Sequence, residues 1–274
     1  MTESPWLSRL SEPPADGIRL FCFPYAGAGA SAFYLWSRDL APSIAVCAVQ
    51  LPGRETRLAE VPVVSLKTIV DTVVREMRAL LDCPFAFFGH SMGTVLAFET
   101  ARKLRDLSLP LPAHLFVSGR GAPDLEKDLA MLHRLPDAEF IAECVRRYQG
   151  IPKAVLDEPE LVNLFLPSLR ADMQAVETYR YDLRDPLECP ITALQGREDP
   201  SPPAALQAWA RHTTAAFRYQ ELPGGHFFIH TARSQIMELI RRTLLCGPSS
   251  AQRNPPKGCP SWGPARSETP RDLE

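Results

Sequence analysis

The sequence has no marked excess of charge of either sign. Its 30 lysine and arginine residues nearly balance 32 aspartate and glutamate residues, which leaves a formal net charge of −2. Proteins that bind nucleic acid or anionic membranes usually carry surplus positive charge. We therefore expect neither nucleic acid nor a membrane as a partner. The sequence also lacks an apolar run long enough to span a bilayer, and we expect no signal peptide.

Paired cysteine motifs are also missing. The seven cysteines are odd in number, and no two of them form a C-x-x-C motif. Several lie inside apolar segments, as Cys22 does between Phe21 and Phe23. This usage is typical of reduced, buried thiols in a cytoplasmic protein rather than of disulfides or metal ligands. We expect a cytoplasmic protein with no metal site.

Strand-like and helix-like segments alternate over much of the chain. At 274 residues and 45% hydrophobic residues, the chain can form one large core. The alternation predicts parallel βαβ units and a mostly parallel, doubly wound α/β sheet. The strand-like segments are 18–23, 44–50, the run that ends near Phe88, 115–119, 190–194 and 216–221, and the helix-like segments include 31–40, 65–81, 94–104 and 232–245.

The alternation stops between about residues 123 and 185. This block has helical patterns and no convincing strand, with helices expected to start near Pro136, Glu158 and Pro167. We interpret it as a helical lid inserted into one domain that spans 1–246. Residues 247–274 are rich in proline, serine, glycine and arginine, and we expect a disordered tail there. Residues 1–16 are polar and contain proline, with Trp6 as a candidate anchor.

The segment Gly89-His90-Ser91-Met92-Gly93 has the pattern G-x-S-x-G. It lies between an apolar strand-like run and a helix-like segment, which is the context of a nucleophile elbow. In such an elbow a sharp turn exposes the serine Oγ, and the two glycines let strand and helix approach closely. The alternative is a glycine-flanked turn that happens to hold a serine. The context favours Ser91 as a nucleophile.

A serine nucleophile needs a base and a third group that orients the base. In α/β-hydrolases the acid and then the histidine follow the serine along the chain, each on a loop after a later strand. Of the six histidines, His226 fits best, because it follows a turn directly after the last strand-like segment. Glu198 and Asp199 both qualify as the acid, although both are equally explained as a solvated charge pair. We favour Asp199 because an Asp-Pro pair readily fixes a loop.

An oxyanion hole needs two backbone amides aimed at the developing negative charge. Met92 supplies one amide by its place after the nucleophile. The second amide is expected from the loop of small residues after the first parallel strand, at Tyr25 or Ala26, and the sequence leaves this choice open. The alternative is a tight loop that binds nothing.

Five motifs between about residues 18 and 245 carry a resemblance to a known family. The motifs are Phe23-Pro24-Tyr25-Ala26-Gly27-Ala28-Gly29, Gln50-Leu51-Pro52-Gly53-Arg54-Glu55, Gly89-His90-Ser91-Met92-Gly93, Leu166-Pro167-Ser168-Leu169-Arg170-Ala171-Asp172 and Pro223-Gly224-Gly225-His226-Phe227-Phe228. With them the chain resembles the type II thioesterases of polyketide and nonribosomal peptide synthesis, and their relatives that release medium-chain fatty acids.

The resemblance implies an α/β-hydrolase fold, a triad of Ser91, Asp199 and His226, and a helical lid. It also implies carrier-protein partners whose phosphopantetheine arm holds the acyl substrate, no cofactor in the chain itself, and a monomer. The leading hypothesis is an editing hydrolase that clears stalled or aberrant acyl units. The alternatives are medium-chain acyl release from a fatty acid synthase, a small-molecule esterase, and a carrier-binding module without activity.

The resemblance further implies an acidic carrier protein. The basic residues of the lid block are candidate contacts for it, although for each residue taken singly a solvated helix face is the better-supported interpretation. They are Arg134, Arg146, Arg147 and Lys153.

Overall fold

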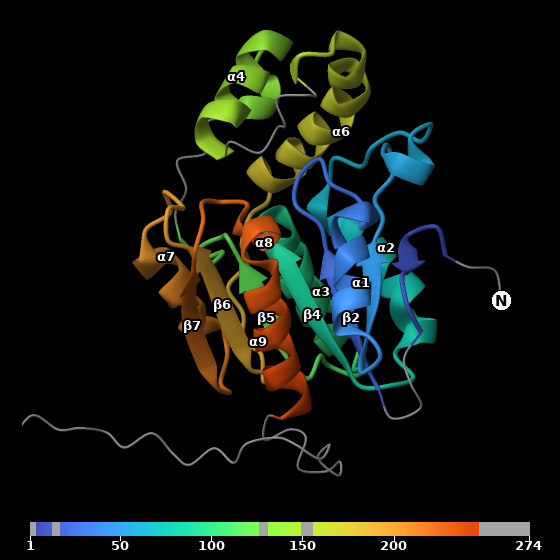
Figure 1. The fold of residues 1–274 in the computed structure, drawn as a ribbon, viewed down its shortest axis with the longest axis vertical. Helices are drawn as coiled ribbons and strands as arrows, with labels where there is room; N and C mark the ends of the chain where they lie inside the picture. Colours follow the sequence, from blue (N-terminus) through green and yellow to red (C-terminus); the bar gives the residue numbers. More distant parts are fainter. Residues whose placement is uncertain (1–3, 13–16, 126–130, 149–155, 247–274) are drawn as a thin grey trace, which may run out of the picture.

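The computed structural model describes residues 4–12, 17–125, 131–148 and 156–246. A seven-stranded sheet crosses the centre in the order β1-β3-β2-β4-β5-β6-β7 (Figure 1). β1 is antiparallel to β3, and the other described pairs are parallel. The sheet is therefore the mostly parallel, doubly wound α/β type that the sequence predicts. The strands are β1 (Leu7–Arg9), β2 (Ile18–Phe23), β3 (Ile44–Val49), β4 (Phe85–His90), β5 (Leu115–Ser118), β6 (Ile191–Gly196) and β7 (Phe217–Leu222).

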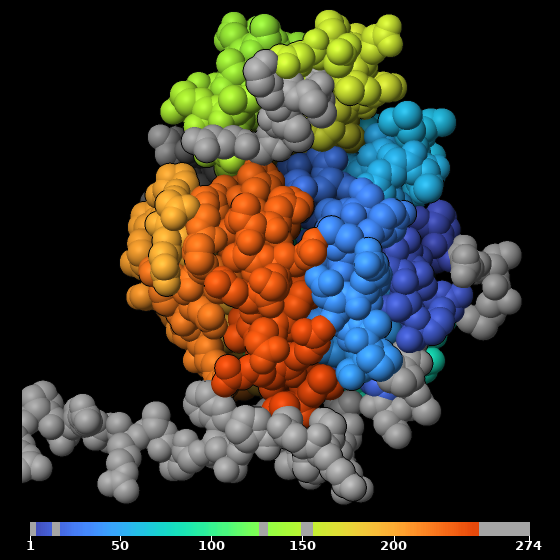
Figure 2. All heavy atoms as spheres, in the orientation of Figure 1, coloured from blue at the N-terminus to red at the C-terminus, as the bar shows by residue number. Residues whose placement is uncertain are grey.

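Helices cover both faces of the sheet. The helices α2 (Leu66–Met77) and α3 (Met92–Asp106) pack together on one face, and α1 (Tyr34–Leu40) and α9 (Arg233–Leu245) on the other. Figure 2 shows α1 and α9 side by side on this second face. Every residue of β2 to β6 is buried. Burial on both faces explains why these strands read as continuous apolar runs.

Several predicted helices differ from the observed ones at their ends. Segment 31–40 divides into a 3₁₀ turn, η1 (Ala30–Phe33), and α1, and the last helix is preceded by the single turn α8 (Phe228–Thr231). α2 begins at Leu66 because the Ser65 side chain caps it, accepting a hydrogen bond from the Thr68 amide at 3.3 Å. It continues into η3 (Arg78–Leu80), and the remaining short elements are η2 (Glu55–Arg57), α7 (Pro203–Gln207) and η5 (Ala208–His212).

The short edge strand β1 is absent from the sequence prediction. It pairs with β3 from Leu7 to Arg9, and Leu7 is buried against the main core. The Trp6 carbonyl accepts a hydrogen bond from the Gln50 amide at 2.9 Å, and the Arg57 guanidinium lies over the Trp6 ring. A three-residue strand has too short a pattern to be recognised, so only its pairing partner reveals it.

The inserted block contains η4 (Leu132–Arg134), α4 (Asp137–Tyr148) and α6 (Pro159–Glu177), and no strand in its described residues. α4 and α6 lie above one end of the sheet (Figure 1). The sequence predicts separate helices starting near Glu158 and Pro167, whereas the structure has one helix with Pro167 inside it. Proline removes one backbone donor. The helix continues because the carbonyl left without that donor belongs to the exposed Asn163, where water can bind it.

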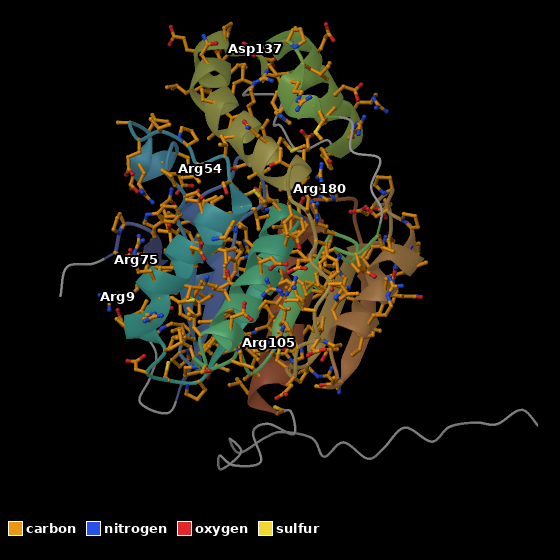
Figure 3. The ribbon with its side chains drawn as sticks, turned by 180° about the vertical axis from the view of Figure 1, so that it is seen from behind. Arg9, Arg54, Arg75, Arg105, Asp137 and Arg180 are labelled. Carbon is orange, nitrogen blue, oxygen red and sulfur yellow. The ribbon has the colours of Figure 1, made fainter. Side chains whose placement is uncertain are left out.

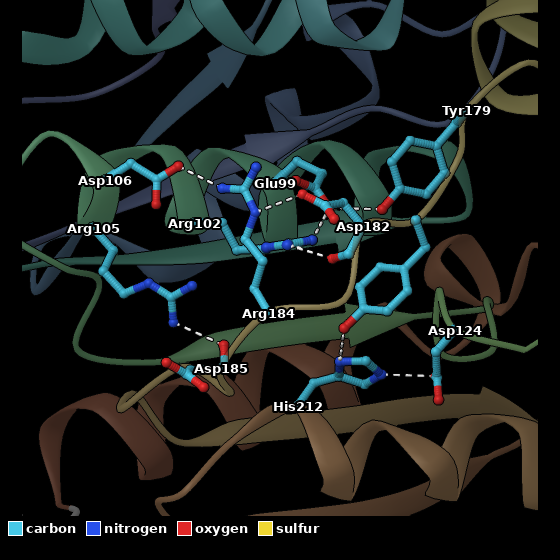
Figure 4. A network of polar contacts seen from close by, with 11 residues as sticks. Glu99, Arg102, Arg105, Asp106, Asp124, Tyr179, Asp182, Arg184, Asp185 and His212 are labelled. Carbon is cyan, nitrogen blue, oxygen red and sulfur yellow. Dashed lines mark hydrogen bonds and ion pairs between the residues drawn. The ribbon is translucent and has the colours of Figure 1, made fainter.

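The segment that leads from α6 back to β6 is fixed against α3. Figure 4 shows this network of polar contacts. Arginines of α3 donate to backbone carbonyls of the returning segment, and side chains of that segment bond back to α3. The pairs are Arg102 Nη2 to Asp182 O (2.6 Å), Arg105 Nη1 to Asp185 O (2.9 Å), Tyr179 OH to Glu99 Oε1 (2.6 Å) and Arg184 Nη1 to Asp106 Oδ2 (2.6 Å).

The cysteines agree with the sequence only in part. Cys22, Cys47, Cys144 and Cys189 are free and buried, and Cys83 is free but half-buried. Cys246 is disulfide-bonded, which corrects the expectation that all seven thiols are reduced. It lies exposed just past the end of α9. Among the described helices, none is long and apolar enough to cross a membrane. The predicted tail, 247–274, lies outside the described residues.

Candidate active site

Ser91 lies at the turn between β4 and α3, in a strained backbone conformation with φ of 53°. Positive φ is unusual for serine, and strain of this kind is concentrated at functional sites. The flanking glycines are required by space, since a Cβ at Gly93 would overlap the Phe23 carbonyl oxygen and one at Gly89 would overlap the Gly93 carbonyl. The sequence pattern has therefore folded into a nucleophile elbow.

His226 and Asp199 come together beside this turn. Asp199 follows β6, and His226 follows β7, the neighbouring parallel strand. The His226 ring nitrogen Nδ1 lies 2.7 Å from Asp199 Oδ2, while Asp199 Oδ1 accepts from the Ser201 amide at 2.8 Å. Both carboxylate oxygens are thus bonded, which holds the ring in one orientation.

The Asp199 carboxylate is stabilised in its charged form. Burial by itself raises the pKa of Asp199, but the hydrogen bond and charge of His226, together with the Ser201 bonds, outweigh burial and lower the pKa below its usual value. An ionised Asp199 keeps the Nδ1 proton on His226 and leaves Nε2 free to accept a proton. Glu198, the other candidate, has an exposed side chain. Its backbone amide donates a hydrogen bond to the Gly224 carbonyl at 3.1 Å.

One narrow cavity, partly open to solvent, joins the predicted site residues. Ser91, His226, Met92, Tyr25 and Ala26 all line it. The candidate nucleophile, the candidate base and all three candidate oxyanion residues therefore border the same space. Helices α4 and α6 contribute the opposite wall through Cys144, Tyr148, Phe165, Leu169, Met173 and Val176. This wall is mostly apolar, which suits an acyl chain.

The loop after β2 that contains Tyr25, Ala26 and Gly27, here called the oxyanion loop, is held by a contact that the sequence analysis did not identify. Asp172 of α6 accepts a hydrogen bond from the Gly27 amide at 2.7 Å and pairs with Arg54, whose Nη2 lies 2.8 Å from Oδ1. Arg54 also donates to Ala28 O at 3.1 Å. Asp172 is fully buried, and Arg54 is 5% exposed. Figure 3 shows Arg54 near the base of α6.

Two further side chains from the same motif complete this support. Gln50 Oε1 accepts from the Ala30 amide at 2.8 Å, and Glu55 Oε1 accepts from Ser31 Oγ at 2.5 Å. Residues 50–55 and Asp172 belong to two motifs that the sequence analysis used only for family resemblance. The sequence shows only that one motif contains an arginine and the other an aspartate, 118 residues apart. Nothing in the linear pattern indicates that the two side chains pair.

His90 is a second functional neighbour that sequence reasoning set aside. Its ring is buried, 5.2 Å from the His226 ring between centroids, and its Nδ1 lies 2.9 Å from Ser118 Oγ. Burial, and then the nearby His226 and His230, lower the pKa of His90 well below its usual value. His90 is therefore a neutral ring packed beside His226, and its Nε2 is buried without a hydrogen-bond partner among the described residues.

The remaining histidines have structural partners. His114 Nε2 lies 2.8 Å from Thr192 Oγ1, His212 Nε2 lies 2.8 Å from Asp124 Oδ1, and His133 Nδ1 lies 2.5 Å from Glu177 Oε2. His230 Nε2 lies 3.1 Å from Tyr25 OH. Among the residues that the structure describes, no group of three or more His, Cys, Asp or Glu side chains is arranged to hold a metal ion.

The basic candidates in the lid block have different environments. Arg146 and Arg147 both pair with Glu143, at 2.7 and 3.0 Å, so their charge is partly balanced. Arg134 is exposed at the end of η4. Lys153 lies outside the described residues.

Comparison with known proteins identifies close relatives. A model of the family described as "Thioesterase domain" matches residues 18–244. Gramicidin S biosynthesis protein GrsT from Aneurinibacillus migulanus is 44% identical over 87% of this chain and 93% of its own. Thioesterase PikA5 from Streptomyces venezuelae is 37% identical over 97% and 96%. The solved structure of the type II thioesterase BorB from the borrelidin biosynthetic cluster superimposes with a TM-score of 0.81 and 36% identity, over 88% of this chain and 98% of BorB.

Proposed function

The chain belongs to the thioesterase domain family and is a thioester hydrolase, and from this premise we propose that it removes stalled or aberrant acyl units from carrier proteins of polyketide or nonribosomal peptide synthesis. The observation that carries the proposal is one cavity that joins Ser91 to the His226–Asp199 pair under an apolar helical wall. Such a site is suited to an acyl chain whose thioester carbonyl reaches the serine.

In the proposed reaction Ser91 Oγ attacks the thioester carbonyl while His226 takes its proton. The negative charge that develops on the carbonyl oxygen is stabilised by the amide of Met92 and that of Tyr25 or Ala26. The C–S bond then breaks, and the pantetheine thiol leaves. A thiol has a pKa of about 8.5, so it departs as thiolate with little help from a general acid. A water molecule activated by His226 then hydrolyses the acyl-serine and restores the enzyme.

The proposed partner is an acyl or peptidyl carrier protein that presents its phosphopantetheine arm to this cavity. The chain itself needs no cofactor for the steps above. Of the three candidate arginines that the structure describes, the exposed Arg134 is the one that does not pair with Glu143. We also propose a cytoplasmic location, which the free thiols of Cys22, Cys47, Cys83, Cys144 and Cys189 favour and the disulfide at Cys246 opposes.

The experiment compares one acyl group on three supports: a carrier protein, free pantetheine and p-nitrophenol. We expect the highest kcat/KM for the acyl-carrier protein, and a decline as salt screens docking. The variant Ser91→Ala is the control, and it should lose several orders of magnitude in kcat while it remains folded. Equal kcat/KM on carrier protein and pantetheine, with no salt dependence, would favour a general esterase. More than about a tenth of wild-type kcat/KM in Ser91→Ala, a loss below ~1.4 kcal/mol, would reject Ser91 as nucleophile.

A further inference from the structure

The cavity contains one strong cation that the proposed chemistry does not use. Arg120 follows β5, the strand beside β4, and its side chain lines the cavity together with Ser91 and His226. Its backbone is fixed from outside, because Trp209 Nε1 donates to the Arg120 carbonyl at 2.8 Å and Trp209 is fully buried. The backbone from which this side chain extends is therefore anchored to the buried Trp209.

Arg120 has no acceptor among the described residues. Its Nε is buried without a hydrogen-bond partner, and no described carboxylate forms an ion pair with it. The titratable groups that influence it are the phenols of Tyr148 and Tyr179. Burial lowers the pKa of Arg120, and the phenols raise it only in part. Even so, an arginine stays protonated in proteins, so the group remains a cation.

Carboxylates on the neighbouring elements are already occupied. Glu99 accepts from Arg102 and from Tyr179 OH, at 2.7 and 2.6 Å. Glu177 accepts from the Leu132 amide at 3.0 Å and from His133. These acids are committed to holding α6 and its surroundings.

An unpaired guanidinium in such a place is energetically costly. Arg120 is half-buried as a whole, but its Nε is shielded from solvent without an acceptor, so the hydration that this N–H loses is not replaced. Most of the cavity wall is apolar, including Leu169, Met173 and Val176, and offers no acceptor. The guanidinium presents five donors in a planar fork, which suits an oxygen acceptor. A substrate that brings such an oxygen into the cavity removes this cost.

We propose that Arg120 is a specificity-determining residue that binds an oxygen acceptor on the acyl chain, so that the enzyme prefers acyl groups with a hydroxyl, keto or carboxylate oxygen over plain alkyl chains. The proposal rests on the thioesterase function proposed above and names a substrate class for it. Apolar contacts with α6 hold the carbon chain, while Arg120 selects for the oxygen. Plain alkyl chains remain substrates, but they leave the guanidinium unpaired.

The test uses pantetheine thioesters of equal chain length: hexanoyl, 3-hydroxyhexanoyl, 5-oxohexanoyl and adipoyl. Each is measured with the wild type, with Arg120→Met and with Arg120→Lys. The ratio of wild-type to variant kcat/KM for each thioester cancels the intrinsic reactivity of that thioester. Arg38→Met, a change of the same type at an exposed site on α1, is the matched control. Thermal unfolding shows whether each variant folds.

For at least one oxygenated thioester we expect this ratio to exceed the hexanoyl ratio tenfold or more, which corresponds to ~1.4 kcal/mol. Arg120→Lys should lose less than Arg120→Met, and Arg38→Met should change nothing. A smaller difference for all three oxygenated thioesters overturns the proposal while wild-type hydrolysis still supports the thioesterase. No hydrolysis of any thioester by the wild type overturns the thioesterase function and this inference with it.

If neither Arg120 variant folds, the wild type decides the question alone. The free acids are then compared as competitive inhibitors. At least one of 3-hydroxyhexanoate, 5-oxohexanoate and adipate should bind tenfold more tightly than hexanoate. Smaller differences for all three overturn the proposal.

Discussion

The buried pair of Asp172 and Arg54 offers the sharpest test of how the oxyanion loop is held. Asp172 reaches from α6 to the Gly27 amide, directly after Tyr25 and Ala26, and its other bonds go to Arg54. The change Asp172→Asn keeps an oxygen that can accept from Gly27 but removes the negative charge. Arg54 then remains buried without its counter-ion.

The structure sets the size of the expected effect. Removing one partner of a buried ion pair costs about 3–5 kcal/mol of folding free energy. For a domain of this size each kcal/mol lowers Tm by roughly 2–4 °C, so we expect a fall of roughly 6–20 °C. A displaced oxyanion amide costs as much as ~100-fold in kcat. KM for an acyl-pantetheine should change much less, since the apolar wall is untouched.

Asp137→Asn is the matched control. Asp137 also pairs with a lid arginine, as Arg170 Nη2 lies 2.6 Å from its Oδ1, but its side chain is 71% exposed. An exposed pair contributes only about 0–1 kcal/mol. The assays are thermal unfolding and steady-state hydrolysis of one acyl-pantetheine. Equal Tm and kcat for the two variants would refute the reasoning, because burial and the link to Gly27 would then have no consequence.

Three further predictions concern the triad, the lid and pH. Asp199→Asn should lower kcat by several orders of magnitude without unfolding the protein, because the His226 ring loses its correct tautomer, whereas Glu198→Gln should be mild. In hydrogen exchange α4 should exchange faster than β4, with the C-terminal half of α6 protected by the ion pair of Asp172 with Arg54. Burial, and then the Arg218 charge, lower the pKa of His114 to about 4, so the unfolded chain binds the extra proton as pH falls below ~6.5.

The pH prediction has a definite sign and size. The stabilisation by neutral His114 is complete above the unfolded pKa and declines as pH falls toward the folded pKa of about 4. Between pH 7 and pH 5 we expect a loss of about 2 kcal/mol in urea unfolding, which His114→Gln should largely abolish. An unchanged pH dependence in that variant would contradict this assignment.

A larger loss at Glu198 than at Asp199 would reverse the triad assignment, and equal exchange in α4 and β4 would count against a mobile lid.

The elements that the sequence predicts correctly are those whose signal is local. The strands β2 to β6 are largely apolar because both of their faces are covered. In α2 the buried residues recur with the helical repeat and form one apolar stripe. Ser91 was recognisable because the elbow places its glycines and its strand–helix context within a few residues. The position of His226 along the chain was predictable because the histidine follows the serine and the acid in α/β-hydrolases.

Other features depend on contacts between distant residues, and only the tertiary structure decides them. Glu198 and Asp199 are adjacent, and only packing shows that Asp199 faces His226 while Glu198 faces solvent. The continuous helix α6 through Pro167 and the short strand β1 likewise run against local signals, and each is held by its surroundings.

By itself the sequence determined the order of the strands along the chain and the turn that holds Ser91, because these depend on residue type and short-range spacing. The tertiary structure alone decided which buried charges meet. Asp172 finds Arg54 and Gly27 across the interface between α6 and the oxyanion loop, while Arg120 finds no acceptor at all among the described residues. Partners of buried charges are set by three-dimensional packing, and a linear pattern does not encode that geometry.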